Sequence, residues 1–193
     1  MEPLFQSERL LYRHLHRSDA HELALLLNDY DVYKTSLNLP YPFTADDGLR
    51  LITSGQEQKE AYLVDSLAVV DKASGKLVGF LRLTYSYFHR HAELGYVIGR
   101  TFRGLGYGTE AVGASVSSLF SMKHFHRVYC RQLGRNPASE KIMEKTGFTR
   151  EGVLVRHFFK IDRYVDVTVY GLNCSSKDAV MPRDKALRPP TIS

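Results

Sequence analysis

The stretch Arg103-Gly104-Leu105-Gly106-Tyr107-Gly108-Thr109-Glu110-Ala111 lies between a strand-like apolar segment, residues 91–99, and a helical pattern over residues 107–124. Glycines allow successive backbone N–H groups to point into one concavity, and the start of the following helix adds the positive end of its dipole. The stretch therefore predicts a loop that holds a phosphate or pyrophosphate, with Arg103 adding a fixed positive charge. The alternative interpretation is a glycine turn that only joins a strand to a helix.

Two familiar phosphate-binding loops do not fit this stretch. The Walker A loop requires Gly-Lys-Ser/Thr, which is absent, and the dinucleotide pattern G-x-G-x-x-G fails because Thr109 stands where its third glycine should be. What remains is the pattern Arg-x-x-Gly-x-Gly over residues 103–108.

The hydrophobic periodicity on both sides of this loop predicts an α+β fold. We expect strands at residues 9–16, 62–70, 76–84, 91–99, 127–133, 148–158 and 164–172, and helices at residues 20–28, 44–59, 107–124 and 136–147. After the first two helices the order is β-β-β-α-β-α-β-β, which indicates one mixed sheet of about seven strands rather than a regularly alternating Rossmann fold. Residues 1–172 are predicted to form a single domain, and residues 173–193, with three prolines and no apolar period, a flexible tail.

Length and composition agree with one ordinary folded domain. The chain has 193 residues, of which 44% are hydrophobic and 24% charged, and it contains no run of about 18 apolar residues that would cross a membrane. Met1 is followed by Glu2 and Pro3 rather than by a basic and then apolar leader, so we expect a cytoplasmic protein without a membrane partner. Of the two cysteines, Cys130 lies in a strand-like run, which predicts a buried thiol rather than a disulfide.

The net charge of +5 does not indicate a nucleic-acid-binding protein. Residues 173–193 contain four basic and two acidic side chains, which leaves about +3 for the predicted domain, and its basic residues alternate with acidic ones. A mildly basic surface suits an anionic small molecule or an acidic partner. The histidine pairs His89 with His91 and His124 with His126 lack a cysteine or carboxylate cluster at zinc-like spacing, so we expect no metal.

Three further motifs accompany the loop in a fixed order. Residues 92–98 read Ala-Glu-Leu-Gly-Tyr-Val-Ile, Asn136-Pro137-Ala138-Ser139 follows the loop, and residues 143–148 read Met-Glu-Lys-Thr-Gly-Phe. With these motifs, the sequence resembles the GNAT superfamily of acyl-CoA-dependent N-acetyltransferases over residues 7–172, and it is most similar to the RimJ/RimL-like branch, which acetylates the N-terminal amines of ribosomal proteins.

The resemblance implies the GNAT fold, a mixed, mostly antiparallel twisted sheet with splayed central parallel strands, and acetyl-CoA as the co-substrate without a metal. It implies that pantetheine inserts between strands 91–99 and 127–133, with the backbone near Tyr96, Val97 and Ile98 bonding its amides. Asn136 would contact the pantetheine arm together with Ser139. The pyrophosphate would lie on the loop residues Arg103, Gly104, Leu105, Gly106, Tyr107, Gly108 and Thr109.

The same resemblance names two candidate catalytic residues. Glu93 aligns with the glutamate that several family members use as a base, and Ser139 is the candidate proton donor to the leaving thiolate. Many relatives place a tyrosine seven residues after the asparagine, where this sequence has Met143. The structural alternatives are a surface or salt-bridged strand residue for Glu93, and a helix N-cap with its first-turn neighbour for Asn136 and Ser139.

The acceptor is expected to be a primary amine that attacks the thioester directly. An N-terminal α-amine has a reference pKa near 7.7–8.0 against about 10.4 for lysine, so a modest base such as Glu93 is better matched to an N-terminus. Small amines such as a polyamine, an amino acid or an aminoglycoside are the alternative, as is a non-catalytic CoA-binding module. The protein is expected to be a monomer or a homodimer. The resemblance places the aromatic residues Tyr30, Tyr33, Tyr41 and Phe43 in the region that covers the acceptor site, and the alternative for each is hydrophobic packing.

Overall fold

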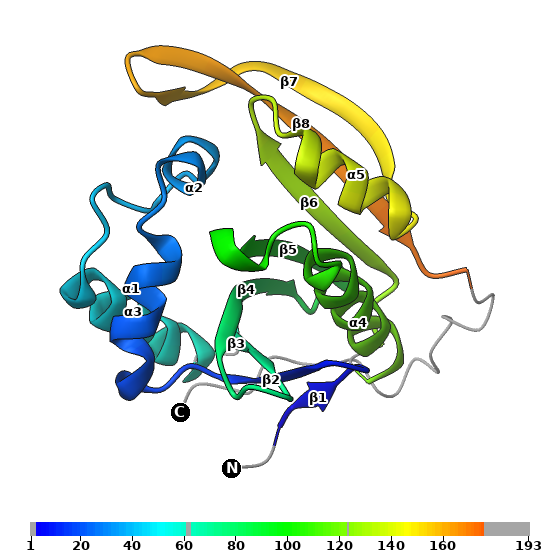
Figure 1. The fold of residues 1–193 in the computed structure, drawn as a ribbon. Helices are drawn as coiled ribbons and strands as arrows, with labels where there is room; N and C mark the ends of the chain where they lie inside the picture. The colour runs from blue at the N-terminus through cyan, green and yellow to red at the C-terminus, as the bar shows by residue number, and fades with distance from the viewer. Residues whose placement is uncertain (1–2, 61–62, 123, 176–193) are drawn as a thin grey trace, which may run out of the picture.

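The computed structural model describes residues 3–60, 63–122 and 124–175, which form one mixed sheet with helices on both faces (Figure 1). The strand order is β1-β2-β3-β4-β5-β6-β8-β7. The strands are β1 (Phe5–Gln6), β2 (Leu10–His14), β3 (Val64–Asp71), β4 (Leu77–Ser86), β5 (His91–Ile98), β6 (Arg127–Leu133), β7 (Thr149–Lys160) and β8 (Arg163–Asn173). The predicted fold class, α+β with a mixed and mostly antiparallel sheet, is confirmed.

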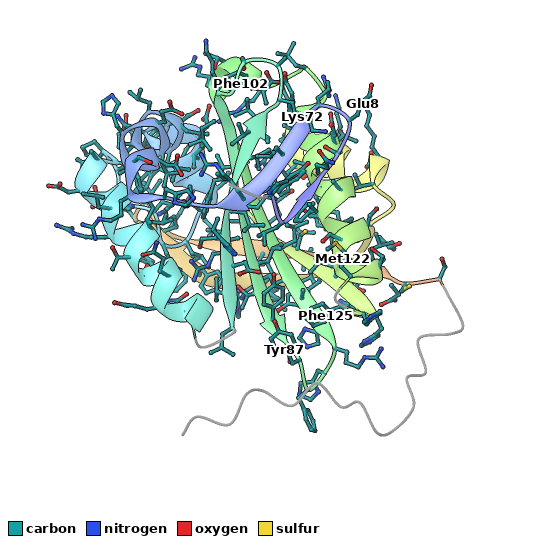
Figure 2. The ribbon with its side chains drawn as sticks, turned by 90° about the horizontal axis from the view of Figure 1, so that it is seen from below. Glu8, Lys72, Tyr87, Phe102, Met122 and Phe125 are labelled. Carbon is teal, nitrogen blue, oxygen red and sulfur yellow. The ribbon has the colours of Figure 1, made fainter. Side chains whose placement is uncertain are left out.

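The helices form two layers. They are α1 (Ala20–Leu27), α2 (Tyr30–Thr35), α3 (Ala45–Glu60), α4 (Tyr107–Ser121) and α5 (Pro137–Lys145), with short 3-10 turns η1 (Arg17–Asp19) and η2 (Arg100–Phe102). Helices α1 and α3 cover one face of the sheet, and α4 and α5 cover the other (Figures 1 and 2). We refer to these as the α1/α3 face and the α4/α5 face.

The central strand β3 shows how the core is divided. Its side chains alternate between faces, so Leu67 and Val69 join the cluster that contains Val112 of α4, while Ala68 and Val70 join the cluster that contains Leu23 of α1. All eight of its residues are buried, because helices cover both faces at this point.

Local sequence signals account for several of the element boundaries. Helix α3 begins with a capping box, in which the Asp47 amide donates to Thr44 Oγ1 at 3.3 Å and the Thr44 amide donates to Asp47 Oδ2 at 2.9 Å. Helix α5 ends at Lys145 with Thr146 as its C-cap, and Gly147 follows with a φ of +84°, the left-handed conformation that commonly terminates a helix. Cys130 is a buried free thiol, as predicted.

Two elements differ from the prediction. Helix α2 begins after Asp29, whose carboxylate accepts a hydrogen bond from the Asp31 amide, and at six residues it is too short to show a helical period. Strand β1 has two residues and raises the number of described strands from the expected seven to eight. Strand β8 ends at Asn173, and residues 176–193 of the predicted tail lie outside the described residues. Within the described ranges, no helix is both long and apolar enough to span a membrane.

The parallel strands β5 and β6 separate along their length. They pair only at His91 with Arg127, Ala92 with Val128 and Glu93 with Tyr129. Residues 94–98 of β5 and 130–133 of β6 are not paired with each other, although β4 and β8 still pair with their outer edges. We call this unpaired stretch the β5–β6 opening, and it agrees with the splay that the family resemblance implies (Figure 1).

Candidate active site

The loop before α4 has the backbone geometry of an anion-binding site. Gly104 and Gly106 adopt φ values of +79° and +84°, and α4 begins at the next residue. The Glu110 amide donates to the Gly106 carbonyl at 3.1 Å and so closes the first turn. The amides of residues 107–109 precede this bond and have no intrahelical acceptor, so they point out of the helix end together with its positive dipole. The loop can therefore bind a pyrophosphate through its backbone.

A carboxylate in the first turn of α4 holds this loop against the β1–β2 hairpin. Glu110 accepts hydrogen bonds from Ser7 Oγ, from the Arg9 amide and from Arg9 Nε, each at 2.7 Å. Arg9 Nη1 donates in turn to the Leu105 carbonyl at 3.0 Å. Burial raises the pKa of Glu110, but these bonds and the Arg9 charge outweigh it and hold the pKa below its usual value. Sequence reasoning missed this role because residues 7–9 and 110 are distant in the chain.

On the α4/α5 face of the opening, two hydroxyl groups meet. Tyr96 of β5 and Ser139 of α5 are hydrogen-bonded, with 2.9 Å between Oη and Oγ. Asn136 Oδ1 accepts from the Ser139 amide at 3.2 Å, so Asn136 is the N-cap of α5, which is one of its two expected roles. Burial raises the pKa of Tyr96, so its phenol stays protonated at neutral pH. The sequence predicted only a backbone role for Tyr96, and its side chain is a second candidate proton donor.

On the opposite, α1/α3 face, Glu93 is held by β6. Its carboxylate forms a two-pronged ion pair with Arg131, with 2.7 Å from Nε to Oε1 and 2.9 Å from Nη2 to Oε2. Tyr129 Oη donates to Oε2 at 3.3 Å. Glu93 is therefore a salt-bridged strand residue, as its structural alternative expected, and it lies at the last β5–β6 pair, where the opening begins. A base role remains a prediction.

Comparison with models of protein families identifies the family of the chain. The model of the acetyltransferase (GNAT) domain matches residues 9–149, which include β5, the glycine loop, α4, β6 and α5. This chain belongs to the GNAT acetyltransferase family. The predicted fold and the predicted enzyme class, an acetyl-CoA-dependent N-acetyltransferase, are confirmed at the level of the family.

Individual GNAT proteins resemble the chain to different extents. A spermidine N(1)-acetyltransferase of Vibrio cholerae serotype O1 is 32% identical over 100 residues, and the match spans 51% of this chain and 58% of that protein. The solved ribosomal-protein-S5-alanine acetyltransferase from Vibrio fischeri superposes with a TM-score of 0.76 at 21% identity, over 88% of this chain and 95% of its own. RimL, a ribosomal L7/L12 α-N-protein acetyltransferase solved with coenzyme A, superposes with a TM-score of 0.81 at 18% identity, over 89% of this chain and 98% of its own. The predicted RimJ/RimL likeness is thus confirmed in the fold.

Within this GNAT loop, Arg103 is not a free charge. Its Nη2 lies 2.8 Å from Asp29 Oδ2, and its Nε donates to the Ile98 carbonyl at 3.1 Å. The side chain is 36% exposed, so it remains partly accessible to solvent. Arg103 therefore links the loop to the start of α2 as well as adding positive charge near the predicted pyrophosphate position.

Gly108 and Tyr107 of the same loop have structural contacts. A Cβ on Gly108 would lie 2.7 Å from Ile142 Cδ1, so the glycine allows α4 and α5 to pack closely. Tyr107 Oη donates to Asp71 Oδ1 at 3.0 Å. Their backbone amides still belong to the open first turn of α4, which is where the GNAT resemblance predicts cofactor contacts.

The histidines and acidic residues do not assemble a metal site in the part of the chain that the structure describes, where no three potential ligands gather. The rings of His89, in the turn before β5, and His91, at the start of β5, stack with 5.9 Å between their centroids. Burial, followed by the nearby positive charges, lowers the pKa of His91, which favours its neutral form.

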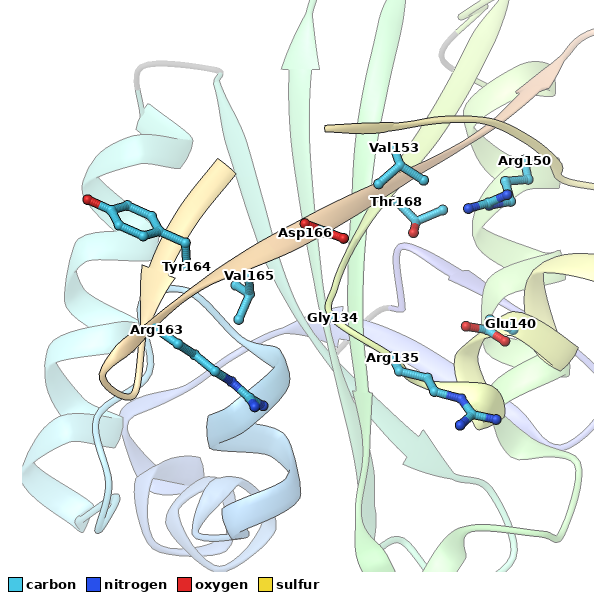
Figure 3. Close-up of a pocket in the computed structure, with 10 residues that line it drawn as sticks. All are labelled: Gly134, Arg135, Glu140, Arg150, Val153, Arg163, Tyr164, Val165, Asp166 and Thr168. Atoms are coloured by element: carbon cyan, nitrogen blue, oxygen red, sulfur yellow. The ribbon is translucent and has the colours of Figure 1, made fainter. Parts of the chain in front are cut away.

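A cavity of about 420 Å³ lies between the start of α5 and strand β8 (Figure 3). Its lining includes Arg135, Arg150 and Arg163 together with Glu140 and Asp166. None of the predicted site residues lines it, so the candidate active site is defined by the opening and the loop rather than by this cavity.

Proposed function

We propose that this chain transfers an acetyl group from acetyl-CoA to a primary amine, with a protein N-terminal α-amine as the acceptor. The observation that carries the proposal is the arrangement at the β5–β6 opening, with Glu93 on the α1/α3 face and the Tyr96–Ser139 pair on the α4/α5 face. A reacting carbonyl between the strands would have a carboxylate on one side and hydroxyl donors on the other.

The residues present fit acetyl-CoA. The glycine loop offers backbone amides and a helix N-terminus to the pyrophosphate, with Arg103 nearby. The unpaired backbone of Tyr96, Val97 and Ile98 on its β6 side can bond the pantetheine amides as an added strand would. Asn136 and Ser139 lie at the start of α5 next to Tyr96. When bound, acetyl-CoA supplies a thioester carbonyl and a thiolate leaving group.

Glu93 would accept the proton of the attacking ammonium, directly or through a water molecule, and Arg131 fixes the orientation of its carboxylate. The amine nitrogen then forms a bond to the carbonyl carbon while the carbon–sulfur bond breaks. The new amide nitrogen loses its second proton to water, and Ser139, hydrogen-bonded to Tyr96, would give its hydroxyl proton to the sulfur and regain one from solvent. The products are an amide and free CoA, and no covalent acyl-enzyme is needed.

The second candidate acceptor is a small polyamine. It is favoured by the relative named a spermidine N(1)-acetyltransferase, which is 32% identical to this chain over 100 residues. The α-amine remains the first candidate because its lower pKa makes deprotonation easier for a carboxylate.

The test is acetyl transfer measured by mass spectrometry with acetyl-CoA and three acceptors. These are a peptide with a free N-terminus and one internal lysine, the same peptide with a blocked N-terminus, and spermidine. We expect acetylation at the free N-terminus and little on the blocked peptide. Acetylation of spermidine alone would replace the acceptor, and calorimetric binding of acetyl-CoA without transfer to any acceptor would favour a non-catalytic CoA-binding module.

A further inference from the structure

Three tyrosines form a surface cluster at α2. The ring centroids of Tyr30, Tyr33 and Tyr41 lie 5.3–5.9 Å apart in all three pairs. Tyr30 is 47% exposed and Tyr41 48% exposed, whereas the neighbouring Phe43 is buried in the core. Of the four aromatic residues considered from the sequence, only Phe43 therefore packs as a core residue, and we call the other three the tyrosine cluster.

Two ammonium groups already lie on the rings of this cluster. Lys160 Nζ is 3.9 Å from the centroid of Tyr33, and Lys34 Nζ is 5.2 Å from that of Tyr30. Lys34 also has a carboxylate partner, Asp31, at 2.7 Å. For Lys160, burial lowers the pKa. Its ammonium lies on the ring of Tyr33 in a cation–π contact.

Lys160 comes from a distant part of the chain. It ends β7, in a hairpin with β8 that arches past the sheet toward α2 (Figure 1). The hairpin tip therefore delivers a primary ammonium to a tyrosine that is 127 positions earlier in the sequence.

The tyrosine cluster lies on the same face as Glu93. Val32 of α2 packs in the core cluster of the α1/α3 face, and α2 also contacts β6. On β6, Tyr129 and Arg131 point to this face and hold Glu93. The elements that carry the cluster and the candidate base are thus neighbours on one face.

We propose that the face of Tyr33, framed by Tyr30 and Tyr41, is a binding subsite for an alkylammonium group of the acceptor, and that Lys160 occupies this subsite in the free enzyme. The role of this subsite rests on the proposed function, because the ammonium group that binds here would be a second positive charge of the amine acceptor. The subsite itself requires only that a free cation replaces Lys160.

Competition between Lys160 and a free alkylammonium for Tyr33 predicts the direction in which removal of Lys160 changes the affinity. Because Lys160 already lies on the ring of Tyr33, a free alkylammonium must displace it before binding the same ring face. Removing the lysine should therefore increase the affinity for a free cation by about fivefold or more. If Lys160 only fastens the hairpin to α2, its removal would leave affinity unchanged or lower it.

The experiment is an NMR titration of the full chain, with labelled tyrosine rings, using butylammonium as the probe. The variants are Lys160→Ala, Tyr33→Leu and Tyr33→Phe. Two further variants serve as controls. Lys145→Ala removes an exposed lysine of α5. Tyr164→Leu removes another exposed aromatic ring, over which the guanidinium of Arg156 lies. The chain has no tryptophan, so tyrosine is its largest aromatic side chain.

We expect Lys160→Ala to bind butylammonium more tightly than the wild type, Tyr33→Phe to retain binding because the ring face remains, and Tyr33→Leu to lose it. Equal affinity in Lys160→Ala and the wild type, or retained binding in Tyr33→Leu, would overturn the proposal. Equal binding of 1-butanol, the neutral counterpart, would also overturn it, because the contact would then be apolar. The titration uses no acetyl-CoA and no turnover, so its failure is distinct from failure of the proposed function.

Discussion

The two faces of the sheet at the β5–β6 opening are built in different ways. On the α4/α5 face, the glycine loop presents backbone amides whose direction is set by two positive φ angles and by the start of α4. On the α1/α3 face, Glu93 and the tyrosine cluster depend on side-chain contacts between elements far apart in the chain. A backbone site can be inferred from a local motif, whereas a side-chain site depends on the tertiary arrangement.

The largest expected effect tests the backbone site. Gly106→Val should abolish acetyl-CoA binding, because φ is +84° and a Cβ would lie 3.2 Å from Arg9 Nη2, at the edge of the loop. Calorimetric titration with acetyl-CoA measures the loss.

The matched control for this variant is Gly75→Val in the β3–β4 turn. Gly75 also has a positive φ, +70°, but no atom lies within 4 Å of the position of its Cβ. Both variants carry backbone strain of about 1–3 kcal/mol, so only the loop variant should lose the ligand while circular dichroism shows both folded. Equal affinity in Gly106→Val and the wild type would mean that the loop is only a turn.

The next effect tests the side-chain site. Glu93→Gln should lower kcat by about 10² or more with acetyl-CoA affinity nearly unchanged, because the amide cannot accept the ammonium proton. Glu151→Gln is the control, since Glu151 also forms a two-pronged ion pair with an arginine of β6, Arg127, at 2.6 and 2.5 Å. Steady-state rates that fall equally in both variants would show that Glu93 acts only through its salt bridge.

The features that the sequence predicted are mainly those that depend on local residues, as the backbone site does. The strands, the capping box at Thr44, the glycine that terminates α5 and the loop were predictable because each depends on residues within a few positions of each other. The splay of β5 from β6 came from the family resemblance, and the register confirms it.

The remainder required the tertiary structure. Helix α2 has one buried residue, Val32, so its sequence carries no apolar period. The partners of Glu93, the phenol of Tyr96 at Ser139 and the lysine on Tyr33 join residues 36–127 positions apart. No local pattern specifies such pairs, because they depend on how strands and helices are placed side by side.

A smaller effect concerns the proton donors on the α4/α5 face. Ser139→Ala should lower kcat by roughly tenfold, since a thiolate is a good leaving group and Tyr96 remains as a donor. The double variant with Tyr96→Phe should lose more than the two single variants combined if either hydroxyl can replace the other. Ser115→Ala is the control, because the Ser115 hydroxyl bonds only the Ala111 carbonyl within α4. Strictly additive losses in single-turnover rates would mean that the two hydroxyls do not substitute for each other.

The smallest expected effect concerns the carboxylate that fastens the loop. Glu110→Gln should lower the free energy of unfolding at pH 7 by about 1 kcal/mol, because the ion pair with the partly exposed Arg9 is lost. The folded-state pKa of Glu110 lies below its ordinary value of 4.5, so its stabilisation is fully present above 4.5 and disappears as the pH falls through the folded pKa. The stability difference between wild type and variant, from urea unfolding, should therefore shrink below about pH 4.5. As a control, Glu57→Gln on the exposed side of α3 should change the free energy of unfolding little, both at pH 7 and below about pH 4.5. A difference that stays constant with pH would show that the pKa of Glu110 is the same in the folded and unfolded chain, and that the loop is held by packing rather than by charge.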